Sequence, residues 1–166
     1  MTAEGSKTES HQPAADPLGA LTNGESYILV VDDNEQNLEL LQAYLEDLGV
    51  PIRTALNGAE ALAHLDRQAP DIVLLDIMMP VMSGFQVCSK IKASPATRDI
   101  PVIMVTALNE VGDVERAVES GADDFLTKPV NKLELLTRVR SLMRVRQLRR
   151  ELDRTLDEMR RLRGED

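Results

Sequence analysis

The sequence of 166 residues has few aromatic side chains and few side chains that bind soft metals. Aromatic residues make up 2% of the chain and tryptophan is absent, which disfavours base-stacking platforms and carbohydrate clefts. The single cysteine, Cys88, excludes an internal disulfide framework and a zinc site built from thiolates. The two histidines, His11 and His64, lie far apart in the sequence, which argues against a histidine-rich metal site.

Long apolar runs are also missing. No segment approaches the roughly 18 consecutive apolar residues that cross a bilayer, and the N-terminus lacks the basic start and apolar stretch of a secretory signal. The formal net charge of −9 argues against bulk attraction to nucleic acid or to an anionic membrane. We therefore expect an acidic cytoplasmic protein that has neither a membrane nor a nucleic acid as its partner.

The order of apolar and polar segments predicts the organisation of the chain. Residues 1–25 are rich in Ser, Thr, Gly, Pro and Glu without periodicity, so we expect a disordered leader. Strands are predicted at residues 27–31, 50–55, 72–75, 101–105 and 124–126. Helices are predicted at residues 37–48, 59–68, 85–93 and 110–120, with a last helix from about residue 130.

The predicted strands carry continuous apolar runs rather than alternating ones. Such runs are typical of strands that are covered on both faces, and hence of a parallel sheet between two layers of helices. The sequence therefore predicts an α/β domain with a doubly wound parallel sheet over residues 26–143.

Polar residues follow the predicted strands where a parallel sheet binds its ligands, at the carboxyl ends. Asp32 and Asp33 follow the first strand, Asp76 the third, Thr106 the fourth, and Lys128 comes just after the fifth. An aspartate or threonine in such a place is often only a helix cap. Capping does not explain the whole set, whereas three carboxylates would suit a hard divalent ion such as Mg²⁺. With the lysine and threonine, they would form a pocket for a phosphoryl group.

Four segments carrying these residues resemble the receiver domain of bacterial two-component response regulators, the CheY-like superfamily. They are VVDDN (30–34), LLDIMMP (74–80), VTA (105–107) and GADDFLTKP (121–129). The resemblance covers residues 26–143. It implies a flavodoxin-like fold with five parallel strands in the order 2-1-3-4-5 and five helices, the last one extended.

The resemblance also implies a role for each site residue. Asp76 would accept a phosphoryl group from the phosphohistidine of a sensor histidine kinase or phosphotransfer protein. Asp33, Asp76 and the backbone carbonyl of Met78 would bind Mg²⁺, with Asp32 beside them, directly or through a water. Lys128 would pair with Asp76 and, after phosphorylation, with the phosphoryl oxygens. The Lys128–Pro129 peptide bond would be cis.

The switch implied by the resemblance lies next to this site. The Thr106 hydroxyl would move to the phosphoryl group, and Phe125 would rotate into the space it leaves; a role for Phe125 in the core alone is the alternative. Neither Met78 nor Leu108, at the predicted rim, can hold a water for hydrolysis, so we expect a long-lived phosphoryl group.

Other functions stay open at this point. We expect a phosphorelay switch without turnover of a separate substrate, which binds a downstream protein target. One alternative is the receiver portion of a larger regulator whose output domain is absent. A Mg²⁺-dependent phosphatase with an aspartyl-phosphate intermediate is another, although Met78 stands where such enzymes usually carry a second acid.

The last predicted helix continues past the end of the receiver. No Pro or Gly occurs from Leu133 to Arg163, and residues 144–166 are expected to form a helical extension. Three interpretations of the extension remain: a parallel coiled-coil homodimer through residues 145–162, which we favour, a linker to an absent output domain, or a basic helix that grips nucleic acid. Interleaved acids and missing aromatics argue against the third. The 3-4-3-4-3 spacing that favours the first is carried by Val145, Leu148, Leu152, Thr155, Met159 and Leu162.

Overall fold

The computed structural model describes residues 26–107 and 111–164. Strands and α-helices alternate along this part of the chain, with one 3-10 helix, η1, after the first α-helix. The strands are β1 (Ile28–Val31), β2 (Ile52–Ala55), β3 (Ile72–Asp76), β4 (Val102–Thr106) and β5 (Asp124–Thr127). The helices are α1 (Glu35–Leu45), η1 (Glu46–Leu48), α2 (Gly58–Arg67), α3 (Gly84–Ala93), α4 (Val111–Glu119) and α5 (Lys132–Leu162).

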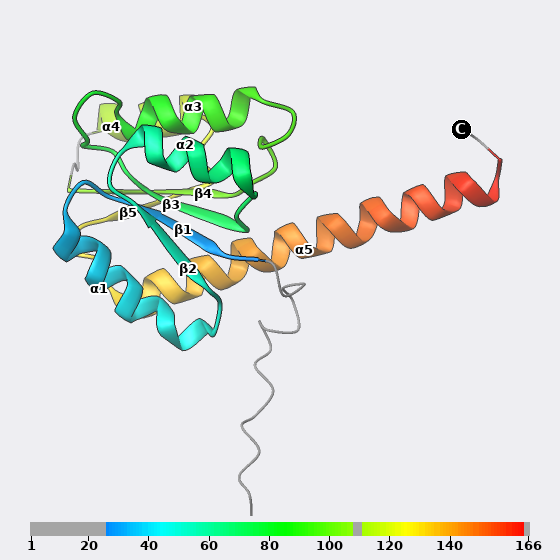
Figure 1. Cartoon of the computed structure of the whole chain (residues 1–166), viewed down its shortest axis with the longest axis horizontal. Helices are drawn as coiled ribbons and strands as arrows, with labels where there is room; N and C mark the ends of the chain where they lie inside the picture. The colour runs from blue at the N-terminus through cyan, green and yellow to red at the C-terminus, as the bar shows by residue number, and fades with distance from the viewer. Residues whose placement is uncertain (1–25, 108–110, 165–166) are drawn as a thin grey trace, which may run out of the picture.

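The five strands form one parallel sheet in the order β2-β1-β3-β4-β5. Helices α1 and α5 cover one face of the sheet, and α2, α3 and α4 lie on the other (Figure 1). The predicted fold class and strand order are therefore confirmed.

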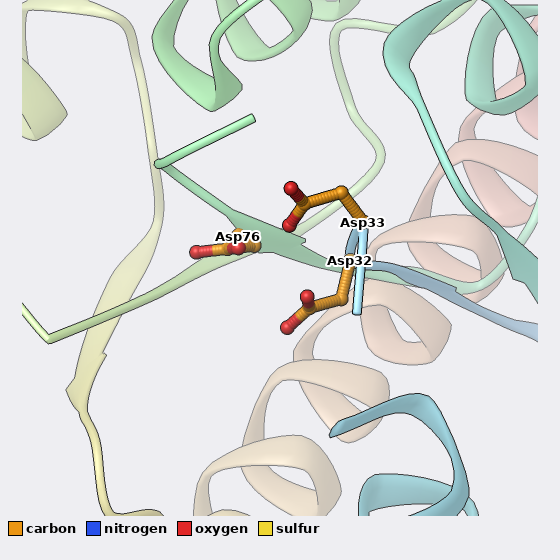
Figure 2. A group of neighbouring side chains, drawn as sticks. All are labelled: Asp32, Asp33 and Asp76. Carbon is orange, nitrogen blue, oxygen red and sulfur yellow. The ribbon is translucent and has the colours of Figure 1, made fainter. Parts of the chain in front are cut away.

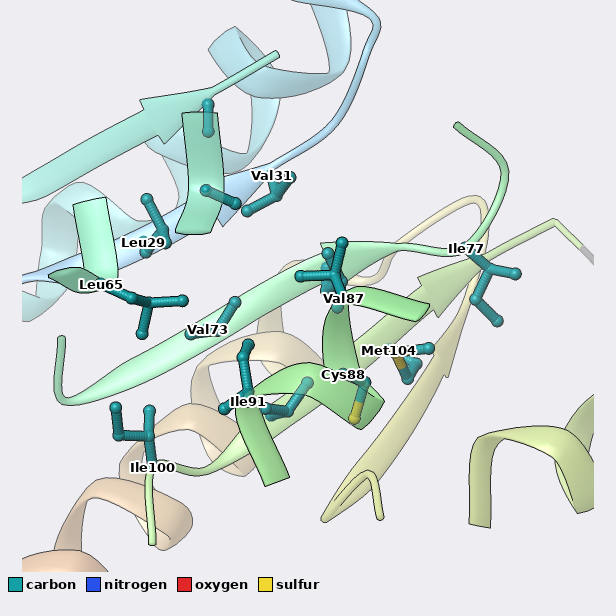
Figure 3. Close-up of a cluster of buried hydrophobic side chains, with 14 of the residues drawn as sticks. Leu29, Val31, Leu65, Val73, Ile77, Val87, Cys88, Ile91, Ile100 and Met104 are labelled. Carbon is teal, nitrogen blue, oxygen red and sulfur yellow. The ribbon is translucent and has the colours of Figure 1, made fainter. Parts of the chain in front are cut away.

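Each strand contributes side chains to both faces, because successive residues of a strand point in opposite directions. On one face, Leu29 and Val73 pack with Leu65 of α2 and with Val87 and Ile91 of α3 (Figure 3). A second cluster on the opposite face includes residues of β1, β3, α1 and α5: Ile28, Val30, Leu74, Leu38, Leu41, Leu45, Leu135 and Val139. The two clusters explain why β1, and β3 and β4 up to their last residue, are apolar on both faces.

The predicted boundaries hold to within a few residues. The helix predicted at 37–48 is divided into α1 and η1, and Gly49 ends it with a left-handed backbone of φ 66°. Asn34 starts α1 by accepting hydrogen bonds from the backbone N–H groups of Gln36 and Asn37. The leader expected at residues 1–25 lies outside the described residues.

Helix α5 is continuous across residue 143, where we expected the receiver to end. Its first half is buried against the sheet through Leu135, Val139 and Met143, whereas every residue from Glu151 to Gly164 is exposed. Figure 1 shows this second half projecting away from the domain. Among the described residues, no helix is long and apolar enough to cross a membrane.

Two arginines fasten α5 to the sheet at the point where the helix leaves it. The buried carboxylate of Asp71, just before β3, accepts a hydrogen bond from Arg150 at 3.2 Å. The Nε atom of Arg146, whose side chain is 10% exposed, lies 3.7 Å from the same oxygen of Asp71. Arg146 also donates to the backbone oxygen of Asp99 at 3.1 Å. These contacts set the direction in which the helix leaves the domain.

Replacing Asp71 with alanine should destabilise the domain. The change would leave the buried guanidinium of Arg146 without its carboxylate, at a cost of about 2–4 kcal/mol in the free energy of unfolding. Urea unfolding of the Asp71→Ala variant measures this loss. Asp99→Ala is the matched control: its carboxylate is exposed, 3.6 Å from Arg149, and should contribute less than about 0.5 kcal/mol. Equal effects of the two substitutions would contradict the anchoring role of Asp71.

Candidate functional site

Three carboxyl groups meet at the carboxyl edge of the sheet. Asp32 and Asp33 follow β1, Asp76 is the last residue of β3, and Figure 2 shows the three side chains at the neighbouring ends of these strands. One carboxylate oxygen from each residue lies within 4.8 Å of the others. The predicted cluster is therefore present. It arises because β1 and β3 pair directly, with Val31 opposite Leu75.

Asp32 is buried and already has two partners. One carboxylate oxygen accepts a hydrogen bond from the backbone N–H of Asn34 at 2.9 Å, and the other accepts one from the ammonium group of Lys128 at 3.1 Å. Asp33 is exposed at the mouth of the site. Asp33 therefore presents its carboxylate to solvent, whereas that of Asp32 is held in place.

Asp76 is buried at the end of β3, with 4% of its surface exposed. Burial raises the pKa of its carboxyl group to about 6, and the nearby charge of Asp32 acts in the same direction. The charge of Lys128 and a hydrogen bond from the backbone N–H of Met78, at 3.3 Å, lower the pKa in part. We did not predict the hydrogen bond from the Met78 N–H. Every residue except proline carries a backbone N–H, so the sequence does not indicate which of them contacts Asp76.

Lys128 lies between two carboxylates. Its ammonium nitrogen is 3.1 Å from Asp32 and 3.6 Å from Asp76, so the pairing expected with Asp76 is present but the shorter contact is with Asp32. The Lys128–Pro129 peptide bond is cis, as predicted. The backbone N–H of Lys128 donates to the backbone carbonyl oxygen of Thr106 at 2.7 Å, which joins the ends of β4 and β5.

The two predicted switch residues lie on the neighbouring strands. Thr106 is fully buried at the end of β4, one residue beyond the pair formed by Asp76 and Val105. Phe125 of β5 pairs with Met104 and is partly buried against the core cluster beneath α2 and α3. The two residues are therefore near neighbours on adjacent strands.

The loop after β3 is folded tightly against the site. Gly84, the first residue of α3, cannot be replaced without strain, because a Cβ atom there would collide with the backbone oxygen of Asp76. Val81 has a φ of 69°, and Met82 N–H donates to Pro80 oxygen at 2.8 Å, which defines a γ-turn. Met78 is 62% exposed beside Asp76. Leu108, the other predicted rim residue, lies outside the described residues.

The carboxylate cluster fits a divalent cation that prefers oxygen ligands. Ligand oxygens on one octahedral Mg²⁺ ion lie about 3–4 Å apart, so the cluster would need to contract only slightly. Three ionised carboxylates and one ammonium also leave the site with an excess of negative charge, which a divalent ion would neutralise. The acidic site is therefore compatible with magnesium.

The family follows from comparison with known proteins. The family model described as "Response regulator receiver domain" matches residues 28–140, which is more than half of the chain. This chain belongs to the response regulator receiver family. Receiver domains are signalling switches rather than classical enzymes, and they bind Mg²⁺ at an acidic site of this kind.

Curated relatives are longer proteins. The response regulator PleD of Caulobacter vibrioides is 54% identical over 117 residues, which are 70% of this chain and 26% of PleD. The transcriptional regulator RpaA of Synechocystis, described as DNA-binding, is 40% identical over 117 residues, 70% of this chain and 48% of that protein. The chain thus matches about a quarter and about half of these two relatives.

Solved receiver structures are similar over most of their own length. A putative response regulator from Chloroflexus aurantiacus has a TM-score of 0.68 at 31% identity, covering 71% of this chain and 97% of that one. The receiver domain of a sensor histidine kinase from Pseudomonas aeruginosa has a TM-score of 0.66 at 31% identity, with the same coverage. The latter is described with a magnesium ion coordinated in its active-site cleft.

The raised pKa of Asp76 predicts a pH dependence of stability in metal-free protein. The folded state keeps the proton up to about pH 6, whereas the unfolded chain releases it near 3.8, so this contribution to stability is lost as the pH rises between those values. Asp76→Asn cannot titrate. Its stability advantage over wild type should therefore grow by about 2 kcal/mol from about pH 4 to about pH 7.

Urea unfolding of both proteins in EDTA, at each pH, measures the difference between their free energies of unfolding. Groups that titrate alike in both proteins do not contribute to this difference. Asp99→Asn, which replaces an exposed carboxyl group at the surface, is the control for the general effect of an Asp-to-Asn substitution. A constant difference between wild type and Asp76→Asn would show that the Asp76 carboxyl group is not perturbed.

Proposed function

We propose that this chain is a phospho-accepting switch in a phosphorelay, with Asp76 as the acceptor. The observation that carries the proposal is the buried Asp76 carboxylate, which lies 3.6 Å from the Lys128 ammonium group and next to the acidic pair Asp32–Asp33. One side chain would attack phosphorus while its neighbours offset the charge of the incoming group. The family of the chain supports the same function.

The proposed reaction is the transfer of a phosphoryl group from phosphohistidine to Asp76. A carboxylate oxygen of Asp76 forms the new O–P bond as the P–N bond breaks, and the electron pair of that bond stays on the imidazole nitrogen. The pKa of about 6 leaves Asp76 largely ionised at neutral pH, as a nucleophile must be. Lys128 is close enough to both carboxylates to turn its ammonium group to a phosphoryl oxygen.

Asp33 and Asp76 are the proposed side-chain ligands of Mg²⁺, together with the backbone carbonyl of Met78. The exposure of Asp33 supports its direct role, whereas both carboxylate oxygens of Asp32 are already hydrogen-bonded, which supports contact through a water. A bound Mg²⁺ ion would neutralise charge on the transferred phosphoryl group.

The proposed switch starts at Thr106. Its hydroxyl group would donate a hydrogen bond to a phosphoryl oxygen, and Phe125 would turn further into the space released on that side of the sheet. The partial burial of Phe125 and its place on the strand next to Thr106 support this coupling. The surface of α4, β5 and α5 would change as a result.

The proposed partners are a sensor histidine kinase or phosphotransfer protein and a downstream protein target, in the cytoplasm. We propose the receiver domain at residues 26–143, after a leader at 1–25, and the helical extension 144–166 as an output element. The extension would act on a second copy of this chain or on an output domain outside the given sequence. The relatives PleD and RpaA are longer than the region that matches this chain, so they have room for an output domain besides the receiver.

Incubation with Mg²⁺ and a small acyl phosphate should phosphorylate the wild-type protein. Intact-mass spectrometry should find one phosphoryl adduct that is stable in acid and labile in base, because an aspartyl phosphate is an acyl phosphate. Asp76→Asn should remove the adduct, and the exposed Asp99→Asn should keep it. EDTA should slow adduct formation about a hundredfold or more.

Two results would contradict the proposal. An adduct on Asp76→Asn that matches the wild type would place the phosphoryl group on another residue. Continuous release of phosphate with many turnovers per chain would instead support the phosphatase alternative.

The phosphoryl group should be long-lived once it is formed. The exposed Met78 side chain beside Asp76 offers no group that could position a water for attack on phosphorus. Introducing Met78→Asn together with Leu108→Glu should speed decay about tenfold or more, measured as loss of the adduct in Mg²⁺. Met78→Leu is the control and should leave decay unchanged; decay of the double variant at the wild-type rate would contradict the explanation.

A further inference from the structure

The second half of α5 carries an apolar row that nothing in the described chain covers. Six side chains of the row are between 42% and 89% exposed. At 3.6 residues per turn they fall within a band roughly 120° wide on the helix. They include Leu156, which is not one of the a and d positions of the heptad spacing. The residues are Val145, Leu148, Leu152, Leu156, Met159 and Leu162.

This apolar row faces away from the chain's own domain. Leu135, Val139 and Met143 point into the core, and Arg146 and Arg150 continue that side of the helix to Asp71. The row lies about half a turn around the helix from them. The receiver to which the row belongs therefore cannot cover it.

The outer part of the helix also lacks support from the rest of the described chain. Among the ion pairs in that part of the structure, the contacts with the domain end at Arg150, and all residues from Glu151 to Leu162 are exposed. A helix of this length is marginal in water on its own, since most helical stability comes from packing of an apolar face. A partner along the row would supply that packing.

We propose that a second copy of this chain covers the row, in a parallel two-stranded coiled coil over residues 145–162. The a and d positions are Val145, Leu148, Leu152, Thr155, Met159 and Leu162, and Leu156 lies beside them at an e position. The seam is shorter than three heptads and contains one threonine, so the association is modest. The association does not require phosphorylation. It rests on the proposed role of the extension as an output element and names the second copy as its partner.

The charges beside the seam favour the parallel arrangement. In parallel pairing, Glu158 at g faces Arg163 at the next e position of the second copy. Antiparallel pairing about the middle of the seam would instead set Glu151 of each copy against Glu158 of the other, which places like charges side by side. Parallel pairing also brings Arg144 near Arg149 of the second copy, but Arg149 has Asp99 at 3.6 Å.

The proposed dimer leaves both phosphorylation sites open. The anchoring arginines and the seam lie on opposite sides of α5, so the two receivers sit on the outside of the coiled coil. The coil leaves the domain beside Asp71, which precedes β3, whereas Asp76 ends the same strand. The acceptor is thus at the opposite edge of the sheet from the seam.

Sedimentation equilibrium of unphosphorylated protein, from micromolar to millimolar concentration, tests the association. Wild type should shift from monomer to dimer as the concentration rises, and Leu152→Lys should stay monomeric. Leu40→Lys, the same substitution at an exposed leucine of α1, should dimerise like wild type. Thr155→Leu should tighten the dimer about tenfold or more, by adding an apolar d position to the seam.

The direction of pairing has its own test. Leu162→Cys should form a disulfide-linked dimer under mild oxidation, because parallel pairing sets the two d positions side by side, and Cys88 is buried. Wild type that remains monomeric at all concentrations, or Thr155→Leu that dimerises no better, would overturn the proposal. Association without the disulfide would overturn the parallel arrangement.

Discussion

The mutual repulsion of three carboxyl groups is the constraint on which the site depends. The core holds β1 and β3 side by side, so Asp32, Asp33 and Asp76 cannot move apart without disturbing strands that are buried on both faces. Lys128 offsets part of the charge, and burial pushes Asp76 toward its protonated form. The site is therefore built to accept positive charge, and a bound cation together with Lys128 would make it ready for an anionic group.

Strand β3 joins the two functional ends of the molecule. Asp76 closes the strand at the carboxyl edge, and Asp71 precedes it at the opposite edge, where it holds Arg146 and Arg150 of α5. The helix therefore leaves the domain in a fixed direction, with its apolar row turned outward. The chemistry and the proposed association surface are separated by the full length of the sheet, so that a partner at one edge does not cover the other.

Much of the fold was predictable because the deciding signals are local. The apolar runs at 28–31, 72–75 and 102–105 identify buried parallel strands, and the polar residues after them mark one edge of the sheet. Asp33 and Asp76 are 43 positions apart in the sequence, which conceals their closeness, but the predicted strand order brings them together. Asp33, Asp76 and Lys128 could therefore be named as one cluster before their distances were known.

The features that sequence reasoning missed depend on contacts between distant residues. Asp71 and Arg150 are 79 residues apart, and neither carries a motif that predicts their pairing. The Lys128 ammonium nitrogen is only 0.5 Å closer to Asp32 than to Asp76, a difference that the spacing of residues in the sequence cannot predict. The left-handed backbone of Val81 was also missed, because a β-branched residue rarely adopts it.

Thermal unfolding with and without Mg²⁺ tests the central claim most directly. Because binding to the folded state alone stabilises it, the midpoint of wild type should rise with Mg²⁺ concentration at constant ionic strength. Replacement of the exposed Asp33 with asparagine should abolish most of that rise. An unchanged midpoint for wild type, or an equal rise for Asp33→Asn, would contradict the account of the carboxylate cluster as a cation site.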